Sequence, residues 1–202
     1  QQQKLMSIIK EDVDRLDRLI SDISDASRLD AELSRAQMKS VDLAHILETL
    51  VDVHSATSDY HAPSIVFLND RDQSDDFVIE AMENRLAQVF SNLIGNALTF
   101  SPSGSTITME AHRGKTKNYG DTIILTFADE GPGIPSGSEE SVFERFYSER
   151  PNSEKFGMHS GLGLSISKQI IEAHGGHIKV ENIIDGHGVI TGAKFIVSLP
   201  AG

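Results

Sequence analysis

The segment that most constrains this fold runs over residues 84–102, with the sequence NRLAQVFSNLIGNALTFSP. At the 3.6-residue period of a helix, its apolar side chains share one stripe, which predicts an amphipathic helix packed on a core. The stripe comprises Leu86, Val89, Phe90, Leu93 and Ala97. Asn92 and Asn96 are four residues apart, so their amides stand one above the other on a different face of the helix.

Two asparagines on one helical face call for an explanation, because the asparagine side chain competes for backbone hydrogen bonds and disfavours helices. A carboxamide oxygen is a hard ligand suited to Mg²⁺, and the amide NH₂ group donates to a phosphate or a ribose. The alternative is a helix that packs its leucine side and leaves both asparagines solvated.

Three later segments bear on this choice. Residues 129–135 (DEGPGIP) follow a strand pattern, residues 142–147 (VFERFY) come next, and residues 160–164 (SGLGL) open a further helix. In this order and at these spacings, the four segments resemble the N, G1, F and G2 boxes of sensor histidine kinases. The resemblance covers essentially the whole chain and implies a Bergerat (GHKL-type) fold. That fold is α+β, a two-layer α/β sandwich in which helices cover one face of a mixed sheet.

The remaining pattern favours the same architecture. Residues 42–58 form an amphipathic pattern that predicts a helix, with Asp42 as its N-cap. Residues 113–120 indicate a polar, basic loop at a hairpin tip, and residues 188–192 a turn. Helices and strands do not alternate regularly, which favours one mixed sheet over a doubly wound fold. Strands are predicted over residues 64–69, 77–80, 106–112, 122–128, 177–182 and 194–199.

Composition excludes several classes of protein. The 202-residue chain has no cysteine, which excludes disulfides and thiolate metal sites. No apolar run approaches the roughly 20 residues that a membrane-spanning helix needs, and no signal peptide is visible. The net charge of −12 argues against a nucleic-acid partner. An acidic protein still binds a nucleotide where a metal ion supplies the compensating charge.

Residues 4–35 have the pattern of one long helix with a wide apolar stripe, which needs partner helices as in a four-helix bundle. The alternative is a lone helix docked on its own domain. The stripe comprises Leu5, Ile8, Ile9, Val13, Leu16, Leu19, Ile20, Ile23, Ala26 and Leu29. Residues 1–36 resemble the second helix of the dimerisation and histidine phosphotransfer domain, most closely that of ChvG-type envelope sensors of alphaproteobacteria. Residues 37–202 then form the catalytic ATP-binding domain.

The phosphoacceptor motif of that family is absent, since none of the eight histidines is followed by an acidic residue and an Arg-Thr-Pro turn. We therefore expect a fragment of a longer protein. The resemblance implies a homodimer through the helical bundle, and membrane attachment only through segments that are missing here. It also implies a location in the cytoplasmic portion of a bacterial inner-membrane protein.

Asp129 follows an apolar strand pattern, where an aspartate is often only a turn former because it accepts neighbouring backbone N–H groups. The functional interpretation is that its carboxylate accepts the exocyclic amine of adenine, whereas guanine would present a repelled carbonyl. Gly131 and Gly133 follow, and the absence of Cβ atoms would let the backbone approach the base. The resemblance implies the same role for Asp129.

The glycine-rich turn at Gly161 and Gly163 precedes a helix, and backbone N–H groups at a helix N-terminus hold phosphate oxygens. A turn of this kind alone is weak support, and neither a dinucleotide fold nor a P-loop fits the surrounding sequence. Residues 148–159 between the turn and the F-like segment have the composition of a mobile lid.

Arg145 lies between Phe143 and Phe146, and its planar, permanently charged guanidinium suits a transferring phosphoryl group. The two rings are expected to anchor the loop on the core. The chain departs from the family at two positions. Thr99 stands where a basic residue is frequent, and His159 where most members have glycine, which puts the nucleotide affinity in doubt more than the function.

The resemblance implies an ATP-binding protein-histidine kinase domain that transfers the γ-phosphoryl group of Mg-ATP to a histidine absent from this chain. A response regulator aspartate would then receive the phosphoryl group. Catalytic roles fall to Asn92, Asn96 and Arg145, and Asn96 is the expected Mg²⁺ ligand. The nucleotide-binding residues expected are Asn92, Asn96, Phe100, Asp129, Gly131, Gly133, Ile134, Phe143, Arg145, Phe146, Ser160, Gly161, Leu162, Gly163 and Leu164.

Two other functions stay open at this point. GHKL-type ATPases activate water with a glutamate four residues before the metal-binding asparagine, but here that position is Asn92. An amide cannot act as a general base at neutral pH, which favours phosphoryl transfer over hydrolysis. The other possibility is a nucleotide-regulated interaction module with a vestigial pocket, and the intact Asn96, Asp129 and glycines argue against it.

Overall fold

The computed structural model describes residues 37–57, 62–69, 77–116, 120–147 and 161–201, together with five helical residues nearer the N-terminus. Those five are Met6, Ile9, Val13, Ile20 and Ser24. The predicted helix over residues 4–35 therefore lies mostly outside the described residues. Within the described ranges, none of the helices has the length and apolarity that crossing a membrane requires.

The described elements are, in chain order, β1 (Lys39–Asp42), α2 (Leu43–Thr57), β2 (Ser64–Asn69), β3 (Val78–Ala81), α3 (Glu83–Phe100), β4 (Thr106–Thr116), β5 (Gly120–Ala128), a short 3₁₀ helix η1 (Ser141–Phe143), α4 (Gly163–Ala173), β6 (His177–Ile184) and β7 (Ile190–Pro200). Five strands form one sheet in the order β2-β4-β5-β7-β6. β2 pairs with β4 in parallel, and the other pairs are antiparallel.

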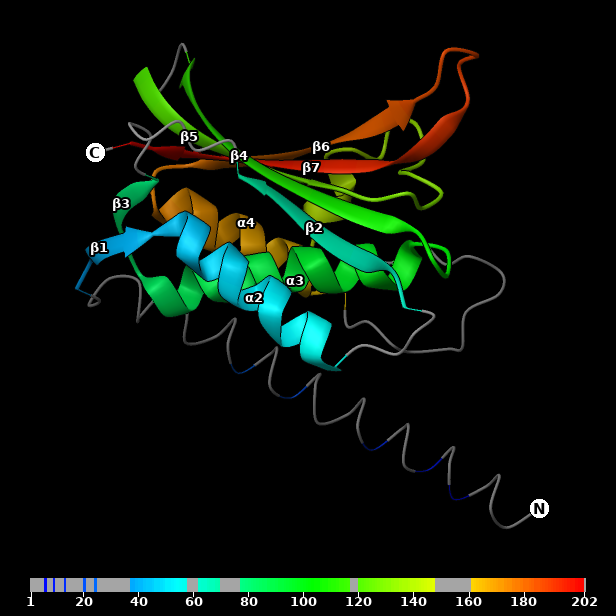
Figure 1. Cartoon of the computed structure of the whole chain (residues 1–202), viewed down its shortest axis with the longest axis horizontal. Helices are drawn as coiled ribbons and strands as arrows, with labels where there is room; N and C mark the ends of the chain where they lie inside the picture. The colour runs from blue at the N-terminus through cyan, green and yellow to red at the C-terminus, as the bar shows by residue number, and fades with distance from the viewer. Residues whose placement is uncertain are drawn as a thin grey trace.

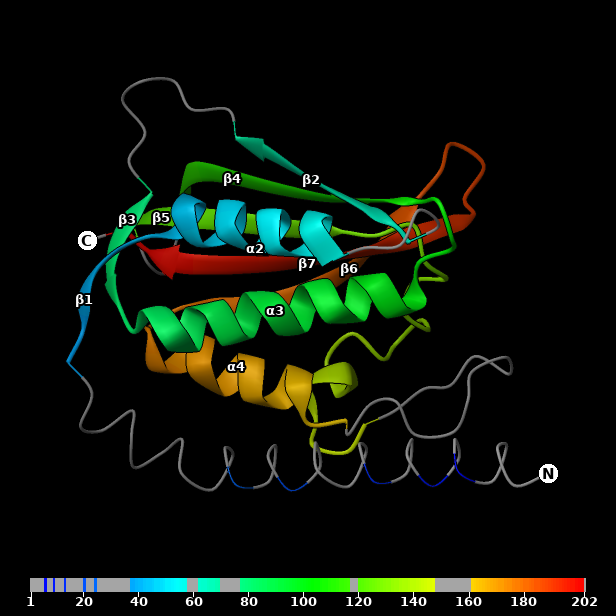
Figure 2. The ribbon, with the colours of Figure 1, turned by 60° about the horizontal axis from the view of Figure 1, so that its bottom comes forward.

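The three helices cover one face of this sheet, with α3 lying between α2 and α4 (Figures 1 and 2). The predicted two-layer sandwich with a mixed sheet is therefore confirmed. The apolar stripe of α3 faces the sheet, and its Leu86, Val89, Phe90 and Leu93 are fully buried. Phe90 packs on Phe127 of β5 with ring centroids 5.7 Å apart. This packing directs Asn92 and Asn96 away from the sheet.

His174 joins the beginning of α3 to the end of α4. Its Nε2 accepts a hydrogen bond from the N–H of Met82, the residue before α3, at 3.0 Å. Its Nδ1 lies 2.7 Å from the carbonyl oxygen of Ile170 in α4. Since Nε2 accepts, Nδ1 carries the proton and donates, so the ring is neutral. Burial lowers the pKa of His174, and the bond to Ile170 opposes this shift.

A small second sheet was not predicted from the sequence. β1 pairs antiparallel with β3, from Lys39↔Ala81 to Asp42↔Val78, apart from the main sheet (Figure 1). Only Val41 of β1 is buried, so this four-residue strand lacks the alternation that signals a strand in a sequence. The predicted N-cap of the next helix is confirmed, because Asp42 Oδ1 accepts the N–H of Ala44 at 3.0 Å.

Two predicted loops differ from the structure in their bounds. The predicted loop over residues 113–120 is wrong in its bounds, because β4 and β5 stay paired from Arg113↔Ile123 to Thr116↔Gly120. Backbone pairing does not require apolar side chains, so polar residues continue the strand into solvent. The turn predicted over residues 188–192 lies earlier in the chain. Asp185 Oδ1 accepts the N–H groups of His187 and Val189, which closes the turn before β7 begins.

Candidate functional site

The polar face of α3 meets the first turn of α4. Asn92 Nδ2 lies 3.3 Å from the carbonyl oxygen of Gly163 and 3.4 Å from Ser167 Oγ. A Cβ on Gly163 would lie 3.6 Å from Asn92 Cγ, so the helix and the amide are in van der Waals contact. Asn92 thus fixes the distance between α3 and the glycine turn, with its amide NH₂ group as the donor.

Asn96 lies one turn further along α3 and is half-buried. The structure gives its amide no hydrogen-bond partner among the residues that it describes, so its oxygen is available to a ligand. Thr99, which stands where the resemblance leads us to expect a basic residue, donates its hydroxyl to the carbonyl oxygen of Gly95 in the same helix at 2.8 Å.

Asp129 lies at the end of β5 and is 5% exposed. Its Oδ1 accepts the N–H of Gly131 at 2.8 Å and the N–H of Ala193 at 3.2 Å. Both bonds end on Oδ1, and no described residue bonds Oδ2, so the carboxylate forms the turn and still has an oxygen for a ligand donor. Burial raises the pKa of Asp129, and the two backbone donors oppose this rise.

The glycines after Asp129 are required by contacts within the protein. A Cβ on Gly131 would lie 3.0 Å from the carbonyl oxygen of Phe100 at the end of α3. Gly133 has φ of +76°, and its Cβ would lie 2.3 Å from Ile190 Cγ2 and 2.6 Å from Asn182 Oδ1. Glycine at these positions was expected because it makes room for a base. The close approach of the loop to α3 and to the β6–β7 hairpin is a second reason for glycine there.

Sequence reasoning missed two residues of this loop's environment. A Cβ on Gly192 of β7 would lie 1.8 Å from the carbonyl oxygen of Asp129, so only glycine fits there. Asn182 of β6 accepts the N–H of Ile134 through Oδ1 and donates to its carbonyl through Nδ2, both at 2.7 Å. In the sequence, the signal that could have pointed to Asn182 was its position inside a strand pattern, where asparagine is depleted.

Two phenylalanine rings flank Arg145, and both were predicted to anchor this segment on the core. Phe143 is buried, edge-on to Phe195 with centroids 6.3 Å apart, and Lys168 Nζ lies 5.8 Å from its ring centroid. Phe146 is 66% exposed, so the prediction that both rings anchor the loop is wrong for Phe146. The backbone there has φ of +65°, which turns the ring outward. Arg145 is exposed beside it.

The glycine turn is fixed by that same segment. Gly161 has φ of +69°, and its Cβ would lie 2.8 Å from the carbonyl oxygen of Tyr147. Its own carbonyl oxygen accepts the N–H of Phe146 at 2.9 Å. Leu162 is buried, Leu164 is half-buried, and no described side chain caps the N-terminus of α4. The N–H groups of Gly163 and Leu164 in the first turn of α4 have no partner among the described residues, and N–H groups at such a position can bind an anion.

These contacts bring the four predicted segments together in space. Asn92 contacts the glycine turn, Gly131 lies against the end of α3, and Gly161 packs on the segment around Arg145. Ser160 and residues 148–159, including His159, lie outside the described residues, and the predicted lid with them.

A metal site built from protein carboxylates or imidazoles alone is not found, because the described residues hold no group of three or more such side chains close enough. The Asn96 oxygen suits a different kind of metal site. Mg²⁺ commonly takes only one or two protein oxygens, together with water and substrate phosphates.

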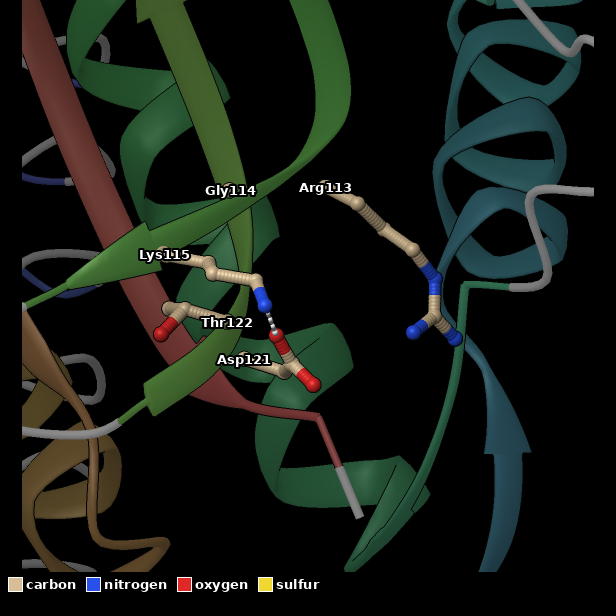
Figure 3. Close-up of a pocket in the computed structure, with 5 residues that line it drawn as sticks. All are labelled: Arg113, Gly114, Lys115, Asp121 and Thr122. Carbon is tan, nitrogen blue, oxygen red and sulfur yellow. Dashed lines mark ion pairs between the residues drawn. The ribbon is translucent and has the colours of Figure 1, made fainter.

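A shallow cavity of about 180 Å³ lies elsewhere, at the far end of the β4–β5 hairpin (Figure 3). It is lined by Arg113, Gly114, Lys115, Asp121 and Thr122. Two of these lining residues, Lys115 and Asp121, form an exposed ion pair of 3.3 Å. None of the predicted site residues lines this cavity, so it is separate from the candidate site.

Comparisons with known proteins agree with this geometry. Residues 81–202 match the family described as histidine kinase-, DNA gyrase B-, and HSP90-like ATPase. The sensor protein ChvG of Agrobacterium fabrum (strain C58 / ATCC 33970) is 47% identical over 203 residues, which covers 98% of this chain and 33% of that protein. The chain thus spans about a third of the length of that curated relative.

Solved structures of sensor kinases share the fold. The crystal structure of full-length ShkA in complex with AMPPNP has a TM-score of 0.72 at 23% identity, covering 98% of this chain and 38% of that one. The mycobacterial sensor histidine kinase MprB has a TM-score of 0.63 at 26% identity, covering 81% and 97%. The chain therefore belongs to the family of histidine kinase-, DNA gyrase B- and HSP90-like ATPases, among the catalytic domains of ChvG-type sensor histidine kinases.

Proposed function

We propose that this domain binds Mg-ATP between α3, the loop at residues 129–134 and the N-terminus of α4, and transfers the γ-phosphoryl group to a histidine of the longer protein. The observation that carries the proposal is the contact between Asn92 and the glycine turn. It sets the polar face of α3 beside the N-terminus of α4, where, among the described residues, no side chain bonds the Asn96 amide and the N-cap residue makes no side-chain cap hydrogen bond. An amide oxygen that can bind a cation thus lies beside N–H groups that can bind an anion. A metal-bound triphosphate needs both kinds of group.

Each part of the nucleotide has a proposed partner. Asp129 Oδ2 accepts the exocyclic amine of adenine, in a pocket also formed by Phe100, Gly131, Gly133 and Ile134. The phosphates lie on the N–H groups of residues 160–164. Mg²⁺, when bound, would be held by the Asn96 oxygen and would neutralise charge on the phosphates.

The segment before the glycine turn supplies the remaining groups. The exposed guanidinium of Arg145 contacts the transferring phosphoryl group, where a bidentate cation stabilises negative charge. Phe143 positions that segment through its contacts with Phe195 and Lys168. The exposed ring of Phe146 lies at the edge of the nucleotide site in this proposal.

The longer protein completes the activity in this proposal. Residues 1–36 belong to the dimerisation and phosphotransfer domain, and residues 37–202 to the catalytic domain. The acceptor histidine lies on the preceding helix, and a response regulator aspartate receives the phosphoryl group from it. In the longer protein, the homodimer forms through the helical bundle to which residues 1–36 contribute, and the attachment to the inner membrane lies in segments outside this chain.

Hydrolysis of ATP is the second candidate, and Asn92 decides against it. Water activation needs a base, whereas the Asn92 amide is neutral and directs its NH₂ group toward Gly163 and Ser167. The proposal is tested by calorimetric titration of the 202-residue chain with ATP and GTP, each with and without Mg²⁺. Tight Mg²⁺-dependent binding of ATP is expected, and equal binding of GTP would contradict the base assignment.

A further inference from the structure

Asn182 makes an unusual pair of contacts across the structure. Its side chain bonds both the N–H and the carbonyl of Ile134, 48 residues away in the chain, at 2.7 Å each. A carboxamide that bonds both backbone groups of one residue replaces the neighbouring strand that this residue lacks. The loop is thereby attached to β6 through a single side chain.

The loop has no regular structure of its own to hold it. Residues 129–135 belong to no helix or strand, and Gly133 has a positive φ of +76°. The loop instead bears on the β6–β7 hairpin, where a Cβ on Gly133 would meet Ile190 and Asn182, and a Cβ on Gly192 would meet Asp129. The part of the hairpin next to its turn therefore supports the loop from Asp129 to Ile134.

We propose that Asn182 is a positioning residue that holds the loop at residues 129–134 in the geometry that binds adenine. This inference rests on the proposed function, because it assigns the loop to the adenine end of the nucleotide. Asn182 acts through the backbone of Ile134 and sets the distance between Asp129 and the end of α3. It determines the affinity for the base and leaves the affinity for the phosphates unchanged.

The chemistry of the pair demands an amide. Aspartate has the same shape but only accepts hydrogen bonds, so Asn182→Asp keeps the bond from the Ile134 N–H and sets a carboxylate oxygen against the Ile134 carbonyl. A protonated carboxyl group again has one acceptor and one O–H donor, as an amide does. The aspartate variant is therefore expected to regain the wild-type contact on acidification.

The test uses the whole 202-residue chain and two probes. Adenosine reports on the base end alone, and Mg-tripolyphosphate reports on the phosphate end alone. Asn182→Asp should weaken adenosine binding by about 10-fold and leave tripolyphosphate binding unchanged. As pH falls through the pKa of the new carboxyl, the ratio of wild-type to variant adenosine affinity should approach one.

Thr191→Asp is the matched control. Thr191 lies on the same hairpin and is exposed, so this variant adds the same charge without touching the loop at residues 129–134. Both probes should bind it as they bind wild type. If Asn182→Asp does not fold, Asn182→Ser, with one hydroxyl in place of the amide, should show a smaller loss for adenosine alone.

Equal adenosine affinity in wild type and the folded Asn182 variant would overturn the proposal. An equal loss for adenosine and tripolyphosphate would also overturn it, because that result indicates general destabilisation. A wild-type chain that binds tripolyphosphate but not adenosine would contradict the proposed function itself. The wild-type measurement thus separates failure of the proposed function from failure of the Asn182 assignment.

Discussion

Asparagine and aspartate have nearly the same shape, yet this domain uses them at positions that are not interchangeable. Asn92 donates to the carbonyl oxygen of Gly163, and Asn182 both donates to and accepts from Ile134. Asp129 only accepts, from the N–H groups of Gly131 and Ala193. Exchanging amide and carboxylate at any of these sites therefore tests the role of the NH₂ donor group with little change in volume.

Asn96→Ala should weaken Mg-ATP binding by at least ~10-fold, or about 1.4 kcal/mol, because it removes the proposed Mg²⁺ ligand. Binding of metal-free ATP should change far less. Calorimetry with and without Mg²⁺ measures both. Thr99→Ala is the control on the same helix, since the Thr99 hydroxyl bonds only Gly95 within α3. Equal Mg-ATP affinity in wild type and Asn96→Ala would remove Asn96 from the site.

Asp129→Asn should reduce the preference for ATP over GTP, because the amide both accepts and donates where the carboxylate only accepts. The fold should survive, since the amide oxygen still accepts the N–H groups of Gly131 and Ala193. Competition between the two nucleotides, followed alongside circular dichroism, measures this. An unchanged preference with an intact spectrum would show that Asp129 is only a turn residue.

Asp129→Asn should also change the stability of the fold, and the direction of this change follows from the pKa of Asp129. The pKa of Asp129 is raised above its ordinary value of 3.8 by burial, so the folded chain binds this proton more tightly than the unfolded chain. Its contribution to the free energy of unfolding is then fully present below pH 3.8 and lost as pH rises through the raised pKa. Asp129→Asn does not ionise, so the variant should gain stability relative to wild type from acid to neutral pH. Urea unfolding across that range checks the sign.

How far a sequence predicts a site depends on where each residue's partners lie. Asn92, Asn96 and Asp129 were predicted because their signals are local: helical spacing and a strand followed by glycines. Asn182 and Gly192 were missed because their partners lie far away in the chain, on the loop after β5. The exposed ring of Phe146 was missed because a positive φ at a phenylalanine has no sequence signature.

At the scale of elements, one neutral imidazole links the beginning of α3 to the end of α4. His174 accepts from the N–H of Met82 and donates to Ile170, and burial lowers its pKa below the ordinary value of 6.5. Protonation would place a second N–H against the Met82 N–H. The contribution of this contact to stability is therefore present above pH 6.5 and lost as pH falls through the lowered pKa.

His174→Gln should remove this pH dependence, because glutamine does not titrate in that range. The wild-type chain should be more stable than the variant at neutral pH, by about 1 kcal/mol for one hydrogen bond, and the gap should close in acid. Chemical unfolding of both chains in the Asp129→Asn background removes the opposite contribution of Asp129. A gap that does not vary with pH would show that His174 is not the titrating group.

The helix α3 was predicted from its long periodicity, whereas the short strand β1 and the ends of β4 and β5 were not predicted. The 18-residue α3 has enough turns for its apolar stripe to be unmistakable. β1 has four residues and one buried side chain, which no periodicity can resolve. The ends of β4 and β5 were missed because their pairing continues through backbone bonds while their side chains turn polar.

At the scale of the whole molecule, the described apolar residues nearest the N-terminus are exposed. Ile9, Val13 and Ile20, which belong to the predicted apolar stripe, are 49%, 57% and 63% exposed. Together with Met6 at 70%, they leave an apolar surface that agrees with the expectation of partner helices. The chain spans about a third of its ChvG relative, so those helices belong to the longer protein in our proposal.

The chain alone should bind ATP yet form little or no acid-labile phosphohistidine, because no histidine has the acidic neighbour of a phosphoacceptor. Adding the separately made phosphoacceptor hairpin of the longer protein should restore labelling from γ-labelled ATP. The restored signal should vanish with Asn96→Ala or Arg145→Ala. Labelling of the chain by itself would identify one of its eight histidines as an acceptor, with His45 and His54 tested first.

The parallel pairing of β2 with β4 also orders the assembly of the sheet. β4 and β5 are joined by a tight hairpin, so they pair locally and early. β2 and β4 are parallel, and the chain between them includes β3 and all of α3. A parallel pair needs such a crossover to be in place before its strands align. We therefore expect the edge strand β2 to pair after the β4–β5 hairpin has formed, because its crossover contains the helix that carries Asn92 and Asn96.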